Sequence, residues 1–504
     1  MPVILALDLG TSALKCMAMN EKSNILSVVA VPYPSASPHP GWLQQNPEEW
    51  IVAAVQAIKQ CQHAIGNQEI GVISLSGHMS GLVLTDRGGA PLYPCITLAD
   101  SRSTNQCDWL QLNMASTIYK NTGNPAINAF LLPKLLWVKD NLPNIYKETE
   151  LILFPKDYLR FRLTGQRATD NTDAGNSLLY DFTKENWNLS LIDQLGLNPA
   201  ILPEVLKPYQ IAGQISPAGA ALFGLKPGIP VVTGAADMAA KAIGYGIQEP
   251  GYVAATIGTS ATILTVVPSI NQAGQDKVTF HPHVIPGALY ALGSHFSGGL
   301  SLNWFSGILS GNQTQADYSL IQSLSRDAQN ISPGSEGLLY LPFLSGSGTP
   351  YFDAYARGSF LGLSTNTRRE TMFRAILEGI SYNLKESLSL FQNMGVEIKT
   401  IRIGGGGMNV KLWPTILANV FDYPVDTIQI SDASAIGAAI IGGFAIGIFK
   451  DLSTPVQQII THKRTVTPNP EISGIYQKNF QLYQASYEKL RDIFKGLNQS
   501  PVSI

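Results

Sequence analysis

The chain has 504 residues, and at about 100–200 residues per domain this length predicts two to four domains rather than one hydrophobic core. Charged residues make up 14% of the chain, against about 25% in an average globular protein, which excludes a disordered, coiled-coil or charge-tail protein. The net charge of −2 and the pI near 6.4 exclude long-range attraction to nucleic acid or to an anionic membrane surface.

The first residues of the chain predict a β-meander. Val3–Leu7, Leu14–Met19 and Ile25–Val31 are apolar or alternating runs, and short polar turns separate them. Short strands and amphipathic helices then alternate, which is typical of an α/β protein. The elements expected after the meander are a helix at Pro47–Gln60, a strand at Ile70–Ser76, and helices at Ala129–Asn141 and Phe154–Leu163.

A second meander begins near the middle of the chain, with expected strands at Tyr252–Ile257 and Ala261–Val267. The string Gly-Thr-Ser-Ala occurs in the first turn of both meanders, at Gly10–Ala13 and at Gly258–Ala261. This repeat at matching points predicts an internal duplication. Because a Pro-Gly turn lies between the halves, we expect two similar domains, which are residues 1–248 and residues 249–504.

Several helices are expected in the second half. Thr367-Arg368-Arg369-Glu370 has the pattern of a capping box and predicts the start of a long helix that continues to Phe391. The uncharged stretch Ala433–Phe449 is shorter than the ~20 residues of a membrane span and predicts a buried helix followed by a turn. The remaining elements expected here are a strand at Thr400–Ile403, a glycine turn at Gly404–Gly407, a helix from about Val410 and a last helix at Ser473–Phe494.

The amino terminus and the cysteines indicate a cytoplasmic protein. The first charged residue is Asp8, so no positively charged segment precedes an apolar stretch and no secretory signal is expected. The 4 cysteines form no Cys-x-x-Cys pair, which favours reduced thiols over disulfides or zinc ligands. His281 and His283 are close in sequence, and we interpret them as structural residues rather than as metal ligands.

Two interpretations of the segment Asp8–Ser12 are open. It is a hairpin turn with an Asx cap, or its N–H groups and hydroxyls bind phosphate while Asp8 holds a hydrated Mg²⁺. The second turn, Gly258-Thr259-Ser260, favours phosphate binding, because two facing turns can grip one polyphosphate. Gly404–Gly407 lies between a strand and a helix, where glycines permit either plain packing or the close approach of a nucleotide.

Asp237 follows a buried strand and a turn of small residues, and it opens an alanine-rich helix. An acid at this position is either a helix cap or a base that accepts a proton from a hydroxyl nucleophile. The segments Ser76–Gly81 and Asp100–Arg102 are expected on loops after short strands, where substrate contacts occur. His78 is a second candidate base, but we favour a loop histidine with one hydrogen bond, because Asp237 already fills that role.

Together these residues resemble the FGGY family of carbohydrate kinases, and within it the xylulokinase branch, over nearly the whole chain. Asp8–Lys15 and Gly258–Ser260 are similar to the two phosphate motifs of the family. The other similar segments are Pro133–Val138, Pro155–Gly165, Leu341–Gly346 and Arg357–Leu363.

The resemblance implies an α/β fold of two duplicated ribonuclease-H-like domains, as in actin-like ATPases, with the active site in the cleft between the domains. It implies that the N-terminal domain binds the sugar and supplies the catalytic base Asp237, and that the C-terminal domain binds the nucleotide. The implied cofactors are ATP and Mg²⁺, with Asp8 and Asp237 at the metal. The residues implied to contact ATP are Asp8, Gly10, Thr11, Ser12, Gly258, Thr259, Gly299, Asn303, Gly405, Gly406 and Asn409. The residues implied to contact the sugar are His78, Met79, Ser80, Asp100, Arg102 and Asp237.

The sugar-facing segments depart from the xylulokinase pattern. His78-Met79-Ser80 stands where those enzymes have Gln-Met-His, and Leu98–Arg102 stands where they have Trp-Asn-Asp-Gly-Arg. Met238 replaces the Asn that usually follows the catalytic Asp. A site built for one pattern of hydroxyls can favour the matching sugar over one that lacks a hydroxyl by a factor of roughly 10⁴ or more. These changes therefore bear on the choice of sugar and leave the kinase chemistry in place.

The expected function is ATP-dependent phosphorylation of a sugar hydroxyl, with a ketopentose such as D-xylulose as the substrate. One alternative is a kinase for another sugar, polyol or aldonate, of the ribulose, glycerol or gluconate class. Another is a non-catalytic nucleotide switch of the actin type, or a sugar sensor. The expected partners are a small sugar and, as the candidate assembly, a second copy in a homodimer; neither nucleic acid nor a membrane is expected.

Overall fold

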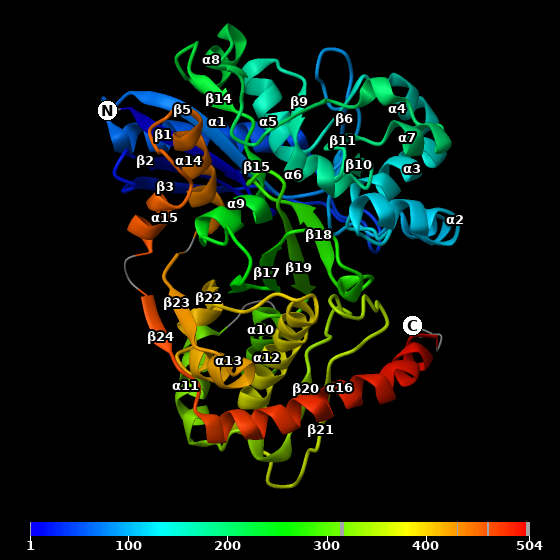
Figure 1. Ribbon diagram of the computed structural model, residues 1–504, viewed down its shortest axis with the longest axis vertical. Coiled ribbons are helices and arrows are strands. Elements are labelled where there is room, and N and C mark those ends of the chain that lie inside the picture. The colour runs from blue at the N-terminus through cyan, green and yellow to red at the C-terminus, as the bar shows by residue number, and fades with distance from the viewer. Residues whose placement is uncertain (1, 313–316, 431, 461–462, 500–504) are drawn as a thin grey trace.

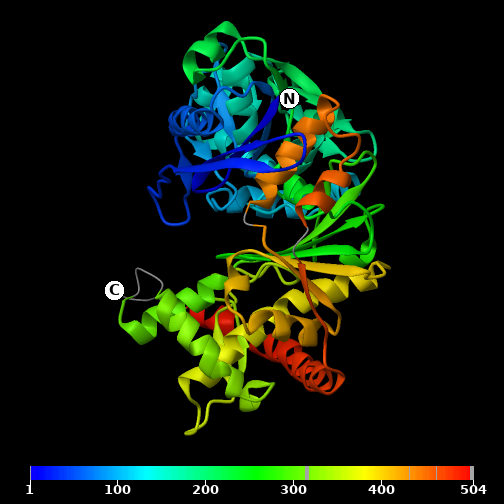
Figure 2. The same cartoon turned by 90° about the vertical axis from the view of Figure 1, so that its left-hand side faces the viewer.

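The computed structural model describes residues 2–312, 317–430, 432–460 and 463–499. The described chain forms two lobes, which lie one above the other in Figures 1 and 2. Each lobe is built around a 7-stranded sheet that helices cover. The upper lobe in Figure 1 contains the N-terminus and is called the N-terminal lobe; the lower one is called the C-terminal lobe.

The sheet of the N-terminal lobe has the chain's first strand near its centre. Its strands, in spatial order, are β13 (Ile211–Gln214), β14 (Pro230–Val232), β5 (Ile70–Gly77), β1 (Val3–Leu9), β2 (Ala13–Met19) and β3 (Ile25–Pro32). The short strand β15 (Ala235–Ala236) also pairs with β5. Every residue of β1 is buried, because alternate side chains enter separate hydrophobic clusters on the two faces of the sheet.

The sheet of the C-terminal lobe repeats this arrangement. Its strands, in spatial order, are β18 (Thr279–Pro282), β19 (Leu289–His295), β17 (Ala261–Val267), β16 (Tyr252–Ile257), β22 (Thr400–Gly404), β23 (Val425–Ile428) and β24 (Lys463–Val466). Strand β16 is antiparallel to β17 and parallel to β22, just as β1 is antiparallel to β2 and parallel to β5. The matching order and directions confirm the predicted duplication of a ribonuclease-H-like core.

Helices of each half cover the sheets. The longer helices of the first half are α1 (Pro47–Ile65), α2 (Thr104–Thr122), α3 (Leu131–Asn141), α5 (Pro155–Thr164) and α9 (Asp237–Gly244). Those between them are α4 (Pro143–Glu148), α6 (Asn171–Ala174), α7 (Leu189–Gln194) and α8 (Pro217–Phe223). The C-terminal lobe contains α10 (Gly299–Ser310), α11 (Tyr318–Asp327), α12 (Arg369–Asn393), α13 (Trp413–Phe421) and α16 (Pro470–Gln499).

Two helices of the second half lie on the N-terminal lobe. In Figures 1 and 2 they are the orange helices α14 (Ala433–Ala445) and α15 (Thr454–Ile459), which lie beside the blue strands. Helix α14 packs on α9 so closely that a Cβ added to Gly437 would lie 1.8 Å from the carbonyl oxygen of Ala240. The cut at residue 249 stays a prediction about folding units, because the second half completes the hydrophobic core of the first lobe.

Most predicted elements are present, with two differences. The predicted capping box is wrong: α12 begins at Arg369 after an N-cap Arg368 without a side-chain cap, and the hydroxyl of Thr367 accepts a hydrogen bond from Ser364 N instead. The helix expected from Val410 begins at Trp413, because a short 3₁₀ turn at Gly406–Asn409 precedes it. The uncharged stretch from Ala433 forms a buried helix and a turn, as predicted. Among the described residues, no helix combines the length and the apolar character that a membrane span requires.

Candidate active site

A cleft with a volume of about 370 Å³ lies between the lobes. Thr11, from the turn between β1 and β2, and Ser260, from the turn between β16 and β17, both line it. The two repeated turns therefore face one cleft, as the duplication predicts. The N-terminal lobe also contributes His78, Met79, Ser80, Asp237 and Lys241. The C-terminal lobe contributes Thr279, His281, Ser294, His295 and Phe296.

Asp237 is the first residue of α9 and lines this cleft. Its Oδ1 atom is buried and has no hydrogen-bond partner among the described residues. Burial raises the pKa of the Asp237 carboxyl to about 6; the negative charge of Asp8 adds to the shift, and Lys241 opposes it. A carboxylate with a free oxygen and a pKa just below neutrality is suited to accept a proton from a hydroxyl group.

The backbone before Asp237 places it beside His78. Ala235 and Ala236 pair in parallel with Ser76 and Gly77 at the end of β5. The chain reaches this position through Gly234, which has a φ of +81°. A Cβ added to Gly234 would lie 2.2 Å from the carbonyl oxygen of Leu75, so no residue with a side chain fits there. The end of β5 thus brings the candidate base and the segment that follows Gly77 to the same side of the cleft.

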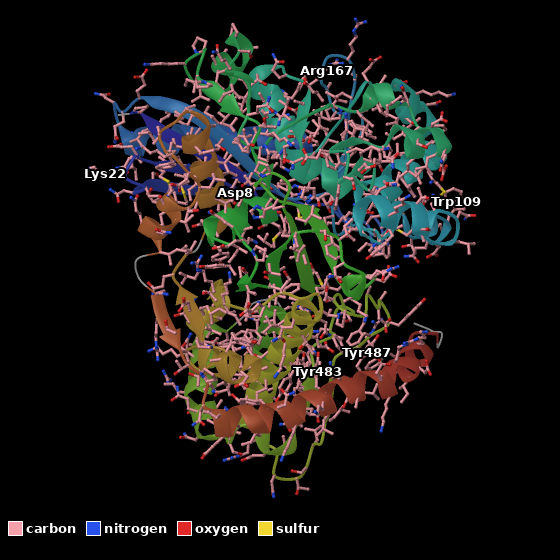
Figure 3. All side chains as sticks on the ribbon, in the orientation of Figure 1. Asp8, Lys22, Trp109, Arg167, Tyr483 and Tyr487 are labelled. Carbon is pink, nitrogen blue, oxygen red and sulfur yellow. The ribbon has the colours of Figure 1, made fainter. Side chains whose placement is uncertain are left out.

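Asp8 lies in the last part of β1 rather than in the turn, and it is 3% exposed. Its Oδ1 accepts a hydrogen bond from the hydroxyl of Ser76 and its Oδ2 accepts one from Ser434, both at 2.6 Å. Ser434 belongs to α14, so the second half of the chain holds the carboxylate that the first half supplies. Figure 3 places Asp8 in the N-terminal lobe, on the side that faces the C-terminal lobe.

The oxygen atoms near Asp8 fit a magnesium ion. A carboxylate has about four lone-pair positions, so the two hydroxyl hydrogen bonds leave Asp8 able to bind a hydrated cation. The unpartnered oxygen of Asp237 lies close enough for the two charges to interact. Oxygen ligands of this kind are those that Mg²⁺ prefers.

Some of the residues assigned to the nucleotide lie together at the end of β16, namely Gly258, Thr259, Gly299 and Gly405. The first amides of α10 donate to the second turn: Gly299 N bonds Gly258 O at 2.7 Å, and Leu300 N bonds Thr259 O at 3.0 Å. Gly405 adopts a φ of +89°, and a Cβ added at this position would lie 2.5 Å from the carbonyl oxygen of Ile257.

The other residues assigned to the nucleotide in this lobe, Gly406, Asn303 and Asn409, differ in their exposure to solvent. A Cβ added to Gly406 would meet no atom within 4 Å. Asn303 is half-buried on α10, and Asn409 is exposed, with its backbone carbonyl accepting from the side chain of Gln322. The glycine loop therefore leaves backbone accessible beside the second turn.

The segment His78-Met79-Ser80, which the resemblance implies to contact the sugar, lines the cleft. The Nε2 atom of His78 is buried without a hydrogen-bond partner among the described residues. Burial lowers the pKa of the His78 imidazole to about 4, so the ring is neutral at pH 7. A neutral ring with an unsatisfied nitrogen can donate to or accept from a ligand hydroxyl.

Asp100 and Arg102 do not line the cleft. They form an ion pair with an N–O distance of 2.7 Å, and both side chains are fully buried. Arg102 also lies 3.7 Å above the ring of Trp42, and Asp100 accepts a hydrogen bond from Leu43 N. The preceding residues 97–99 do line the cleft.

The structural interpretation of His281 agrees with its contacts. Its Nδ1 lies 2.6 Å from the side-chain oxygen of Asn176, and its Nε2 lies 2.8 Å from the hydroxyl of Thr279. Because both nitrogens have protein partners, neither is free to bind a metal. That the His281 ring lines the cleft could not be predicted from the sequence, because it depends on how β18 meets the other lobe.

Known proteins share this arrangement. The pattern of the FGGY family of carbohydrate kinases, N-terminal domain, matches residues 3–244, and that of the C-terminal domain matches residues 253–446. The chain is 33% identical to the xylulose kinase of Bacillus subtilis, over 99% of each chain. Among solved structures, a ligand-bound xylulose kinase from Lactobacillus acidophilus is 26% identical with a TM-score of 0.91 and covers 99% of this chain and 100% of its own.

A gluconate kinase from the same organism is equally similar, at 26% identity and a TM-score of 0.91, over 98% of this chain and 99% of its own. The overall fold is thus shared by kinases named for different substrates. With both domain patterns matched and a relative above 30% identity over nearly the full length, the chain belongs to the FGGY family of carbohydrate kinases.

Proposed function

We propose that this kinase transfers the γ-phosphoryl group of ATP to a hydroxyl of D-xylulose, with Asp237 as the catalytic base. The observation that carries the proposal is the buried, unpartnered oxygen of Asp237 in a cleft that both phosphate-type turns line. The xylulose kinase relatives support the choice of a ketopentose.

In this proposal the protein supplies positioning and charge, which is most of what phosphoryl transfer needs. Asp237 accepts the proton of the attacking hydroxyl. The N–H groups and hydroxyls of Thr11, Ser12 and Thr259 hold the phosphate oxygens, since the N–H groups of Gly10 and Gly258 donate to Ala13 and Ser260 within the turns. Gly299, Asn303, Gly405, Gly406 and Asn409 form the binding surface for the rest of the nucleotide. Asp8 would hold Mg²⁺, which neutralises phosphate charge when it is bound.

A kinase for an aldonate is the second candidate, and one observation favours it. Lys241 lines the cleft within the same helix as Asp237, so a cation is available to a carboxylate group of the substrate. The gluconate kinase of similar fold acts on such a compound according to its name.

The two candidates are separated by a coupled assay of ADP release with D-xylulose, D-ribulose, glycerol and D-gluconate at equal concentrations. D-xylulose is expected to give the highest kcat/KM. A higher kcat/KM for D-gluconate would replace the ketopentose by an aldonate, and no increase over basal ATP hydrolysis with any compound would favour a switch or a sensor.

The pH dependence of this reaction follows from Asp237. A base must be unprotonated to act, and its pKa is raised to about 6, so kcat/KM is expected to fall tenfold per pH unit below about pH 6. Between pH 7 and 8 this group imposes no further change. A profile that stays flat down to pH 4.5 in a buffer series of constant ionic strength would contradict the assignment.

His78 is expected to contribute to sugar binding. His78→Ala removes a nitrogen that has no protein partner, and an unreplaced hydrogen bond is worth about 1 kcal/mol, so KM for the sugar should rise by roughly three- to tenfold. KM for ATP in the same assays is the internal control and should not change. An equal rise of both constants would indicate a general distortion of the cleft.

The location and assembly are further parts of the proposal. The free state of Cys16, Cys61, Cys95 and Cys107 supports a cytoplasmic location, where thiols are kept reduced. The candidate homodimer stays a prediction, and sedimentation velocity of the full chain would test it.

A further inference from the structure

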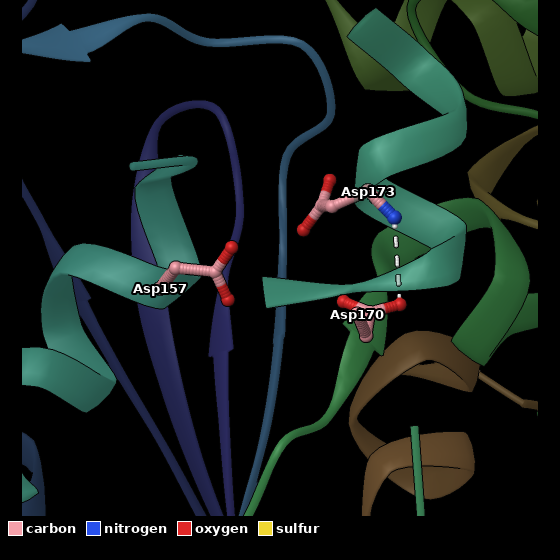
Figure 4. Close-up of side chains that lie close together, drawn as sticks. All are labelled: Asp157, Asp170 and Asp173. Atoms are coloured by element: carbon pink, nitrogen blue, oxygen red, sulfur yellow. Dashed lines mark hydrogen bonds between the residues drawn. The ribbon is translucent and has the colours of Figure 1, made fainter. Parts of the chain in front are cut away.

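A cluster of charged side chains lies inside the N-terminal lobe, behind the segment that carries Asp237. It consists of Lys156, Asp157, Arg160, Asp170 and Asp173, all with 0% exposure, and is called the ionic cluster below. Figure 4 shows the three carboxylates, with Asp157 on α5 and Asp170 and Asp173 from the segment that enters α6. Charges this deeply buried are expensive unless each is paired, so the cluster calls for an explanation.

The three carboxylates are close enough to hold a cation, but the protein supplies its own. The Nζ atom of Lys156 lies 2.5 Å from Asp157, 2.6 Å from Asp170 and 3.0 Å from Asp173. Burial lowers the pKa of the Lys156 ammonium, but the three carboxylates outweigh burial and raise it overall, so the lysine stays charged. The ammonium group of Lys156 therefore occupies the place between the three carboxylates that a metal ion would need.

Two hydrogen bonds connect the ionic cluster to the segment before Asp237. Arg160, paired with Asp157 at 2.7 Å, donates to the carbonyl oxygen of Thr233 at 3.1 Å. Thr172 accepts a hydrogen bond from Ala236 N at 2.8 Å through its hydroxyl oxygen. Both bonds end on backbone atoms within four residues of the candidate base.

The hydroxyl of Thr172 can satisfy both of its hydrogen-bond partners, Asp170 and Ala236, only by donating to the first and accepting from the second. It donates to Oδ1 of Asp170, which as a carboxylate can only accept. A lone pair of the same oxygen is then left for the N–H of Ala236. Since Lys156 fixes the other oxygen of Asp170, the orientation of Thr172 is set by the cluster.

We propose that Thr172 is a positioning residue for Asp237, and that the ionic cluster exists to hold it. The inference rests on the proposed role of Asp237 as the base. The N-cap of α9 is Ala236, which offers no side-chain cap, so this backbone bond replaces the usual local anchor for the start of the helix. The cluster thereby fixes the point from which the side chain of Asp237 enters the cleft.

The test compares Thr172 with Thr169, two buried threonines whose hydroxyls each donate to an aspartate of the ionic cluster. Thr172→Val keeps the shape and removes the hydroxyl, whereas Thr172→Ser keeps the hydroxyl. Thr169→Val is the matched control, because the hydroxyl of Thr169 is equally buried and donates to a member of the ionic cluster, Asp157, at 2.6 Å, but makes no bond to Ala236. All variants are assayed with MgATP and D-xylulose, or with the best acceptor of the four-compound assay, and their melting temperatures are recorded.

The expected result is a drop in kcat of roughly 10- to 100-fold for Thr172→Val, with KM for ATP and sugar unchanged, since a misplaced base affects the chemical step. Thr172→Ser and Thr169→Val should keep a kcat close to that of the wild type, although Thr169→Val should melt at a lower temperature. Wild-type kcat in a folded Thr172→Val protein, or an equal loss in Thr169→Val, would overturn the inference.

Two further variants keep the test decisive. If Thr172→Val does not fold, Thr172→Cys provides a similar volume with a weak hydrogen-bonding group, and its kcat should fall well below that of Thr172→Ser; equal values would refute the role. Asp237→Asn separates the two proposals. If it retains turnover, the proposed base is wrong; if it is inactive while Thr172→Val is fully active, only the positioning role fails.

Discussion

Asp237→Asn is expected to lower kcat for the sugar by ~10²–10⁴, because the variant removes the group that accepts the hydroxyl proton. Asparagine has nearly the same shape and remains neutral, so binding of the sugar and of ATP should change little. The folded state should not suffer either, since the raised pKa of Asp237 shows that burial disfavours its charged form. The measurement is kcat and both KM values from ADP release, together with the melting temperature.

A matched control for this variant is Asp181→Asn. Asp181 is also buried, but it caps the backbone of Thr183 and Lys184 in the N-terminal lobe, and asparagine can accept the same hydrogen bonds. Its kcat should equal that of the wild type. Unchanged turnover in Asp237→Asn, with the natural acceptor sugar, would remove the residue from the mechanism.

Gly437→Ala is expected to destabilise the protein by ~3 kcal/mol or more, which is the upper range for adding an atom to a packed core. The added Cβ would lie 1.8 Å from the carbonyl oxygen and 2.6 Å from the carbonyl carbon of Ala240. Both partners are backbone of buried helices, so α9 and α14 would have to separate. Because α9 begins with Asp237 and α14 carries Ser434 to Asp8, kcat should fall as well. Urea unfolding and ADP release measure the two effects.

Gly474→Ala provides the control in the same protein. Gly474 lies inside helix α16, and a Cβ added there would meet no atom within 4 Å. Alanine is favoured over glycine inside a helix by about 1 kcal/mol, so this variant should be equal to or more stable than the wild type. If Gly437→Ala behaved like Gly474→Ala, the close crossing of α9 and α14 would be incorrect.

The sequence was sufficient for the features that depend on local patterns. The apolar run of β1, the glycine turns and the alanine-rich start of α9 each have a strong signature, and the repeated Gly-Thr-Ser-Ala string disclosed the duplication. The equivalence of the two turns then followed from their places in the meanders. The free oxygen of Asp237 fits the role inferred from its position at a strand–helix junction.

Features that depend on distant contacts could not be predicted. The side chain of Thr367 bonds Ser364 rather than the start of α12, because the preceding loop offers a competing partner. Asp100 and Arg102 are expected at the sugar, but they pair with each other, and Arg102 lies over the ring of Trp42.

The position of α14 on the N-terminal lobe and the burial of the charged residues of α5 also could not be predicted. The stretch that forms α14 was recognised as a buried helix, yet nothing in its composition says that it covers the sheet of the other half. The charged residues of α5, such as Lys156, look like a solvated helix face, because pairing with Asp170 and Asp173 arises only in the folded chain. The signal that could have disclosed the cluster is their position beside strongly apolar neighbours in a short helix.

The most direct test is a crystal structure of the wild-type protein with D-xylulose, Mg²⁺ and a non-hydrolysable ATP analogue. We predict that the phosphates contact the turns at residues 10–12 and 258–259, and that a primary hydroxyl of the sugar lies within about 3.2 Å of the Asp237 carboxylate, on the side of the γ-phosphate. A sugar bound in the cleft with no hydroxyl near Asp237, or phosphates bound away from the two turns, would contradict the account.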